Sequence, residues 1–534
     1  MANVLNKIRS HVLMEAADEQ NARRFSALNR ECGKHIEDSS NPVLFFNAST
    51  RLTRTSLNAA FEWITANSLQ RGGVPVHFLR CDAGLQPCLL ATVFGEKNCA
   101  GCRALSQKMY DGLESTAIHF EDDKVVANDV EGLDISGLAA YTHEGVPLGE
   151  LTLPSLRWIL RKHHLDEDAA PLHRKFIRSA WSTYLQAKET IEKLSPRAIV
   201  VFNGLQYPEA TVKWLGKSLN IPTFTHEIGL MPFTAIFTDG EATACPIELP
   251  DDFEMTPERD AKLDEYLSKR MKGSFTTAGI QFWPEMQGLS QEFWERAREY
   301  RQIVPVFTNV VFDTSQKHAN VVFDNMFDWL DSVKTLIEDN ADTLFVIRAH
   351  PDEARKGKES HETVTDWVKD RRLRYLPNVL YVGPEEYLSS YELIRASKFV
   401  MVYNSTIGLE ASIMGAGVLC AGRSRYTQVP LSWFPQTAAE YMKKAQKLLS
   451  EASITVPPEF RQTARRFMYY QFFHTALPFE DFIEPDGVWN GYVKIRRFSA
   501  DALDPDENQV LGIIRDGILS GKPFVLPHRE KPEN

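Results

Sequence analysis

Apolar, strand-like runs alternate with helical patterns twice along the chain, and this alternation limits the possible folds more than any other feature. The first block has strand-like runs at 42–47, 74–80, 197–204 and 221–229, and the second at 304–312, 343–350, 378–383, 398–404 and 417–422. Strands separated by helices pair in parallel, and the helices then cover both faces of the sheet. The sequence therefore predicts an α/β protein with two doubly wound, Rossmann-like units.

The length agrees with this division, because 534 residues exceed what one hydrophobic core usually organises. We expect an N-terminal helical segment (1–40) and a first Rossmann-like domain (41–270) with an insertion that contains clustered cysteines. A second Rossmann-like domain (271–455) and a C-terminal helical segment with a tail (456–534) follow.

Charge and hydropathy exclude some classes of function. The net charge of −11 argues against a general nucleic-acid binder, which would need clustered Lys and Arg, so any phosphate site should be small and local. No run reaches the roughly 18 apolar residues of a membrane-spanning helix, and the N-terminus lacks the core of a signal peptide. We expect a cytoplasmic protein. Val4, Leu5, Ile8, Val12 and Leu13 fit one helical face, for packing on protein or, alternatively, for peripheral contact with a membrane.

Two strand ends of the second block carry groups suited to phosphate. In "FVIRAHPDE" the apolar run ends at Arg348, His350 and Pro351, and in "FVMVYNSTIGLE" it ends at Asn404, Ser405 and Thr406, before a helix. Ligands of open α/β sheets bind outside the carboxyl ends of strands, and a helix start attracts anions. Ser405 or Thr406 could instead be a simple N-cap, and the first motif a surface turn.

These motifs carry a resemblance. "RAHPDE" followed by "YNSTIGLEASIMGAGVL" resembles the bacterial capsule polysaccharide synthesis family, which includes Kdo transferases, and more distantly the His-Pro glycosyltransferases among sialyltransferases and teichoic-acid polymerases. The similarity is clearest over 300–430, with a weaker trace in "RRFMYYQFF".

The resemblance implies a GT-B fold that binds a nucleotide-sugar donor in the C-terminal domain and a saccharide or glycolipid acceptor in the N-terminal one. It implies that Arg348, His350, Ser405 and Thr406 contact donor phosphates and that Glu410 holds the ribose. Asn404 belongs to the same turn. It further implies chemistry without a divalent metal, and contact with the inner membrane or a polysaccharide assembly complex.

A glycosyl transfer also needs a base for the acceptor hydroxyl or a carboxylate that attacks the sugar. In "IPTFTHEIGL" a short strand ends at His226 and Glu227, and Glu227 suits either role, with His226 as the alternative. The same segment could instead bind substrate oxygens or be structural. Other candidate cleft linings are Asn47, Ser49 and Arg51 in "FNASTR", and "VFNGLQYPE" around Asn203 and Gly204.

Four of the seven cysteines cluster, at Cys81, Cys88, Cys99 and Cys102. Cytosolic thiols stay reduced, and four thiolates suit a structural zinc ion or an iron–sulfur cluster. Only the final C-x-x-C has a standard zinc spacing, so unmetallated thiols are a third possibility. The cluster is not among the core motifs of the resembled family.

Three functions remain open on the sequence. The leading interpretation is a glycosyltransferase of bacterial surface polysaccharide synthesis. A nucleotide-sugar epimerase of the same architecture would change a nucleotide sugar without an acceptor, and a non-catalytic scaffold would bind no nucleotide.

Overall fold

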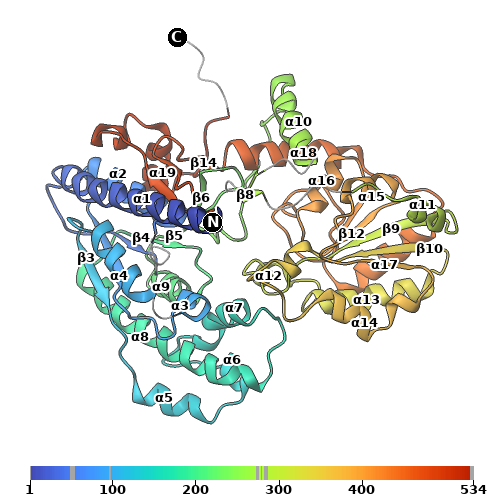
Figure 1. Ribbon diagram of the computed structural model, residues 1–534, viewed down its shortest axis with the longest axis horizontal. Coiled ribbons are helices and arrows are strands. Elements are labelled where there is room, and N and C mark those ends of the chain that lie inside the picture. The colour runs from blue at the N-terminus through green and yellow to red at the C-terminus, as the bar shows by residue number, and fades with distance from the viewer. Residues whose placement is uncertain are drawn as a thin grey trace.

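The computed structural model describes residues 2–48, 54–95, 98–271, 276–277, 280–281 and 287–528, with the backbone alone for 2–15, 94, 276–277 and 280–281. Two sheets dominate it, each with helices on both faces (Figure 1). They confirm the expected α/β class and its two Rossmann-like units, in a GT-B-like arrangement.

The N-terminal sheet has the order β14-β6-β5-β4-β1-β2-β3. Neighbours among β1 to β5 pair in parallel, while β6 runs antiparallel to β5 and β14 antiparallel to β6. The strands are β1 (Val43–Phe46), β2 (Val76–Cys81), β3 (Ser115–Ile118), β4 (Ala198–Phe202), β5 (Thr223–Ile228), β6 (Thr234–Thr238) and β14 (Leu477–Pro478).

Alternating side chains of β1 belong to two hydrophobic cores, because successive residues of a strand point to opposite faces. Val43 and Phe45 join the cluster that includes α1, α2 and α19, whereas Leu44 and Phe46 join the one that includes α7, α8 and α9. The helices of this domain are α1 (Ala2–Gly33), α2 (Leu57–Arg71), α3 (Leu89–Phe94), α4 (Asn98–Met109), α5 (Lys124–Glu131), α6 (Ile135–Ala139), α7 (Leu148–Leu160), α8 (Ala170–Leu194), α9 (Tyr207–Ser218) and α19 (Gln509–Ser520).

The C-terminal sheet is parallel throughout, in the order β11-β10-β9-β12-β13. Of its middle strands, β10 and β12 are buried along their whole length and β9 from Ile303 on, as expected for a parallel sheet covered on both faces. The strands are β9 (Gln302–Phe307), β10 (Thr343–Arg348), β11 (Val379–Val382), β12 (Val400–Val402) and β13 (Val418–Cys420). The helices are α10 (Pro257–Met271), α11 (Gln291–Ala297), α12 (Gln316–Ala319), α13 (Met326–Asp339), α14 (Val364–Asp370), α15 (Ser390–Ala396), α16 (Ile407–Ile413), α17 (Ala438–Ser450) and α18 (Pro458–Phe473).

Short elements complete the described fold. Two small antiparallel pairs are formed by β7 (Thr276–Thr277) with β8 (Ile280–Gln281) and by β15 (Ile483–Pro485) with β16 (Val493–Ile495). Four 3₁₀ turns lie at Glu167–Ala169, Pro351–Ala354, Leu373–Tyr375 and Ala500–Leu503.

Both ends of the chain differ in detail from the predicted segments. The C-terminal segment is helical at α18 and α19, but it also returns to the N-terminal domain, where β14 adds to the sheet and α19 packs near α2 (Figure 1). On α10, Leu263 and Leu267 share a core with the C-terminal sheet, although they precede the expected boundary at 271.

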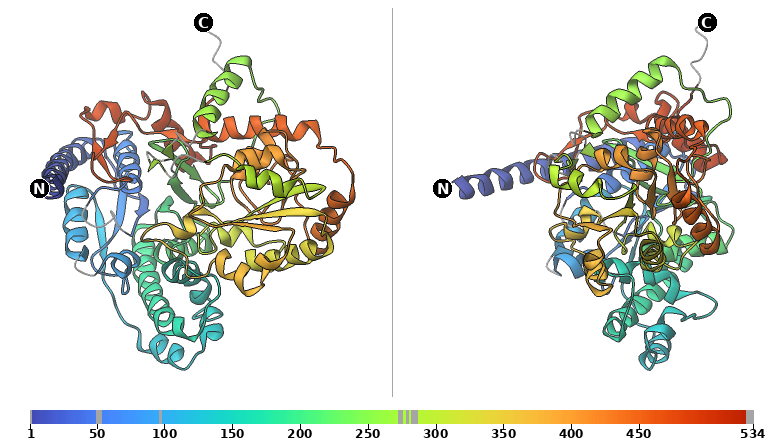
Figure 2. Two further views of the ribbon diagram at one scale, coloured as in Figure 1. Left: turned by 45° about the vertical axis from the view of Figure 1, so that its right-hand side comes forward. Right: turned by 90° about the vertical axis from the view of Figure 1, so that its right-hand side faces the viewer.

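The first helix, α1, has 32 residues, and its N-terminal end projects from the body of the protein (Figure 2). The side chains of the five apolar residues predicted to form one face lie outside the described part. Within the described part, no helix is both long and apolar enough to cross a membrane.

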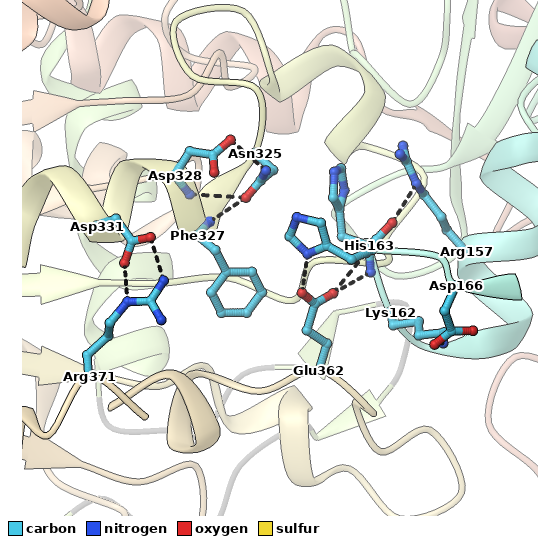
Figure 3. A network of polar contacts seen from close by, with 11 residues as sticks. Arg157, Lys162, His163, Asp166, Asn325, Phe327, Asp328, Asp331, Glu362 and Arg371 are labelled. Atoms are coloured by element: carbon cyan, nitrogen blue, oxygen red, sulfur yellow. Dashed lines mark hydrogen bonds and ion pairs between the residues drawn. The ribbon is translucent and has the colours of Figure 1, made fainter. Parts of the chain in front are cut away.

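Glu362 joins the two domains by hydrogen bonds and an ion pair. This C-terminal-domain carboxylate accepts hydrogen bonds from the backbone N–H groups of His163 (2.7 Å) and His164 (3.1 Å), and it pairs with the His164 ring (Figure 3). The backbone N–H of His361 donates to the carbonyl oxygen of Arg161 beside it.

Replacing Glu362 by alanine should therefore loosen the two domains. The loss of two charge-assisted hydrogen bonds should lower the free energy of unfolding by about 1–3 kcal/mol. Denaturant unfolding measures this, with the exposed Glu359→Ala as a control that should change little. Equal stability of the two variants would contradict the role given to Glu362.

Candidate functional site

A pocket of about 500 Å³ lies where the carboxyl ends of the C-terminal strands meet the loop that follows β6. We call it the anion pocket, because its wall combines two arginines with hydroxyl, amide and imidazole groups. The lining residues are Thr243, Ala244, Pro246, Asn309, Val310, Asp313, Ser315, His318, His350, Asp352, Asn404, Ser405, Thr406, Arg423, Ser424, Arg425, Tyr426 and Gln428.

The turn after β12 brings Asn404, Ser405 and Thr406 into this wall, as the sequence predicted for one shared site. The Asn404 side-chain oxygen accepts a hydrogen bond from Asn309 Nδ2 at 2.7 Å, which fixes the turn to the end of β9. Because α16 has only seven residues, we expect any anion here to be held by side chains and not by the helix dipole.

Tyr426 holds the same turn in place by a hydrogen bond. Its hydroxyl donates to the carbonyl oxygen of Ser405 at 3.0 Å. A Cβ atom on Gly408 would lie 2.1 Å from the Tyr426 hydroxyl oxygen, so only glycine lets α16 approach this closely.

His350 and Arg348 have different positions, although both follow β10. His350 lines the pocket, and its Nδ1 accepts a hydrogen bond from the backbone N–H of Asp352 at 3.2 Å, so its proton is on Nε2. Burial lowers the pKa of His350, the Asp352 carboxylate opposes this, and Arg348 lowers it further, with the net direction downward. Arg348 lies outside the lining. It is buried and donates to the carbonyl oxygen of Glu386 at 3.3 Å, and burial lowers its pKa to about 10.

Glu410 also lies outside the pocket lining. It is 2% exposed, and its two oxygens accept hydrogen bonds from Arg270 Nε (2.6 Å) and the Tyr391 hydroxyl (2.5 Å). The carboxylate thus joins α16 to α10 and α15, and the ribose-binding role stays a prediction that this placement does not favour.

Several lining residues were missed by the sequence reading. Arg423 and Arg425 follow β13, and Asn309 follows β9. The strand-end rule could have found Arg423 and Arg425, whereas Asn309 lay inside the predicted run 304–312, because β9 ends earlier, at Phe307. No sequence pattern pointed to His318 on α12 or to Thr243 after β6, because they reach the pocket from elements far apart in the sequence.

The candidate catalytic pair of β5 separates into two environments. Glu227 is partly exposed and accepts a hydrogen bond from Asn203 Nδ2 at 2.7 Å. His226 is fully buried between Phe202 and Phe237, and burial lowers its pKa to about 3. Two neighbouring residues of one strand point to opposite faces, which explains the difference.

Of the other candidate linings, only Asn47 is found at a second, smaller pocket of the N-terminal domain, of about 70 Å³. Asn47 lines it together with Trp158 and Glu209. Asn203 and Gly204 lie beside Glu227 and Lys213 instead. Ser49 and Arg51 lie outside the described residues.

The four clustered cysteines come from three neighbouring elements of the N-terminal domain. Cys81 ends β2, Cys88 precedes α3, and Cys99 and Cys102 lie one turn apart on α4. Within the described ranges no three His, Cys, Asp or Glu side chains are grouped to hold a metal ion. Burial raises the pKa of Cys81 to about 12 and also raises that of Cys88, which favours protonated thiols. The predicted zinc or iron–sulfur centre is not supported by this arrangement.

Residues 271–462 match the family model of capsule polysaccharide biosynthesis proteins. The match contains all five strands of the C-terminal sheet and the pocket-lining turns that follow them, but not the lining loop after β6. A comparison with curated protein sequences gave no match.

Solved structures with a similar chain path include a KpsC β-Kdo 2,4 transferase of Thermosulfurimonas dismutans, with 13% identity, a TM-score of 0.34, and coverage of 51% of this chain and 79% of that one. They also include a UDP-GlcNAc 2-epimerase of Neisseria meningitidis bound to UDP-GlcNAc, with 11% identity, a TM-score of 0.24, and coverage of 80% and 99%. We draw no conclusion about activity from similarities of this size.

Substituting Gly408 by alanine should damage the turn that presents Ser405. The added methyl group must displace Tyr426, and such overpacking costs about 1–3 kcal/mol of unfolding free energy. Denaturant unfolding measures the cost. Gly132→Ala is the matched control, since no atom lies within 4 Å of a Cβ there. If Gly408→Ala is as stable as the control, the close approach of α16 is not required.

Proposed function

We propose that the protein is a glycosyltransferase of capsule-type surface polysaccharide synthesis, and that the anion pocket binds the phosphate of its nucleotide-sugar donor. The observation that carries this proposal is the composition of the pocket wall, where Arg423 and Arg425 converge with Ser405, Thr406 and His350 at strand ends of a parallel sheet. The family match over the same strands supports the capsule context.

The chemistry of the wall suits a phosphate better than a carboxylate or a neutral sugar. Guanidinium groups form paired, charge-assisted hydrogen bonds with phosphate oxygens, and hydroxyl and amide groups can donate to the oxygens that remain. A leaving nucleoside phosphate gains negative charge in the transition state, and preorganised cations stabilise it. Because two guanidinium groups already face the pocket, the proposal keeps the expectation that the chemistry needs no divalent metal ion.

Glu227 is the proposed catalytic carboxylate for the acceptor. It ends β5 of the N-terminal domain, it is partly exposed, and Asn203 orients it. Both a general base and an attacking carboxylate need an accessible, oriented oxygen. His226 offers neither, because its ring is enclosed by aromatic side chains, and the proposal does not include it.

The proposal is tested first by a thermal-shift panel of CMP, UDP, GDP and their sugars. A ligand stabilises the native state in proportion to RT ln(1 + [L]/Kd), so one nucleotide class should raise the melting temperature. A nucleotide sugar that is changed without any acceptor would indicate an epimerase instead. A chain that no nucleotide stabilises would contradict the proposal and favour a scaffold.

Three substitutions in the wall should weaken binding of the stabilising nucleotide sugar without unfolding the protein: Arg423→Ala, Ser405→Ala and His350→Asn. The asparagine keeps an acceptor for the Asp352 N–H. Each lost hydrogen bond to a charged group should reduce affinity by about 10- to 100-fold in a titration. The exposed Arg461→Ala is the control. Unchanged affinity in all three variants would mean that the donor binds elsewhere.

The variant Glu227→Gln should keep donor affinity and lose turnover. The amide has the shape of the carboxylate, but it can neither accept the acceptor's proton nor attack the sugar. Single-turnover transfer should slow by about 10²- to 10⁴-fold, the range for a lost general base. Glu192→Gln, on the surface of α8, is the control. Turnover close to that of the wild type would remove Glu227 from the mechanism.

A further inference from the structure

A chain of three charged or titratable groups runs from the N-terminal domain to the wall of the anion pocket. Lys213 Nζ on α9 lies 3.0 Å from Glu241 Oε1, and Glu241 Oε2 lies 3.2 Å from His318 Nε2 on α12. Thr243 Oγ1 lies 2.9 Å from the same imidazole nitrogen. His318 and Thr243 line the pocket, so the chain joins the two domains at that wall.

Glu241 Oε2 is buried. No described residue donates a well-aligned hydrogen bond to it, although His318 Nε2 lies 3.2 Å away. Burial alone would raise the pKa of Glu241, but the Lys213 ammonium lowers it below its ordinary value, so the group is a carboxylate. An imidazole lone pair aimed at a carboxylate would be repelled. The neutral ring of His318 therefore carries its proton on Nε2 and a lone pair on Nδ1.

The surroundings of His318 keep it neutral in the protein alone. Burial lowers its pKa, Glu241 opposes this, and three cations (Lys213, Lys317 and Arg423) lower it further. The other charged or titratable groups on the pocket wall are Arg425, His350, Asp313 and Asp352. An anion in the pocket would offset the charge of these cations and raise the pKa of His318.

We propose that His318 takes up a proton on Nδ1 when a phosphate group binds in the anion pocket, and that the imidazolium then bridges the phosphate and Glu241. The proton comes from solvent, and no covalent bond changes. The inference rests on the proposed function, because a nucleotide sugar is the anion expected there. His318 would then be a phosphate-contacting residue whose counter-charge is supplied by the other domain.

Hydrogen bonding gives the reason for proton uptake. A phosphate accepts hydrogen bonds and donates none when fully ionised, so it cannot pair with the lone pair on Nδ1. In the imidazolium the Nε2 proton stays beside Thr243 and Glu241, and the added proton on Nδ1 gives a new donor for the phosphate. His350 differs, because protonating its Nδ1 would break the hydrogen bond from Asp352.

The affinity of the pocket for the anion should therefore depend on pH. The anion raises the pKa of His318, so binding is tightest below the pKa of the protein alone. Affinity then falls as pH rises through the pKa of the complex. Arginines stay charged over this range.

Isothermal titration calorimetry with sulfate tests the proposal, because sulfate does not titrate between about pH 6 and about pH 8, whereas nucleoside monophosphates do. Measuring in buffers with different ionisation enthalpies gives the protons taken up per sulfate. We expect a substantial fraction of one proton in the wild type. We expect none in His318→Gln, which keeps a donor for Glu241 but cannot titrate, and less in Glu241→Gln. Uptake should persist in His350→Asn and in the control His361→Gln, on the surface.

Sulfate binding without proton uptake, or uptake that survives in His318→Gln, would overturn the proposal and leave the proposed function standing. If neither sulfate nor any nucleotide sugar binds the wild type, the proposed function fails and this inference with it. If His318→Gln does not fold, an NMR titration of wild-type and Glu241→Gln imidazole protons replaces it. A histidine pKa that rises with sulfate in the wild type, and rises less in Glu241→Gln, is then required.

Discussion

Parallel pairing in the C-terminal sheet is the constraint on which the candidate site depends. Because β9, β10, β12 and β13 all run in one direction, their carboxyl ends reach one edge, and the turns that follow them meet there. Each turn supplies a different group to the anion pocket: an amide after β9, an imidazole after β10, hydroxyls after β12 and guanidiniums after β13. No single turn would make an anion site.

The N-terminal domain completes the pocket through one loop. The residues after β6 are attached to the other domain at Gln428, whose Nε2 donates to the carbonyl oxygen of Cys245 and whose Oε1 accepts from the N–H of Ile247. This attachment places Thr243 and Glu241 against His318. A change in the angle between the domains would separate these groups, so the pocket depends on both sheets although one sheet forms most of it.

Much of this arrangement could be predicted from the sequence, and the failures have physical causes. The apolar runs predicted all five strands of the C-terminal sheet and β1, β2, β4 and β5 of the N-terminal sheet. The two strand-end motifs lie at one pocket, at His350 and at Asn404–Thr406. The resemblance assigned Glu410 to the ribose, and its carboxylate faces Arg270, a residue 140 positions earlier that no local pattern could pair with it. The two-residue strand β14 was missed because its apolar pattern is too short to detect, and it exists only by pairing with β6.

The metal site at the four cysteines was predicted from their spacing along the chain alone. Close spacing along the chain predicted a shared metal, and in the structure α3 lies between Cys88 and the pair on α4. The described side chains include no group arranged to hold a metal ion, so the metal stays a prediction. The thiols of Cys81 and Cys88 are instead partly buried groups with raised pKa values.

Hydrogen–deuterium exchange with and without the nucleotide sugar that stabilises the protein tests the central claim most directly. The account predicts slower exchange in four separate segments, 243–246, 309–318, 404–408 and 423–428, because both domains line one phosphate site. Protection confined to one domain, or protection elsewhere with these four segments unchanged, would contradict it.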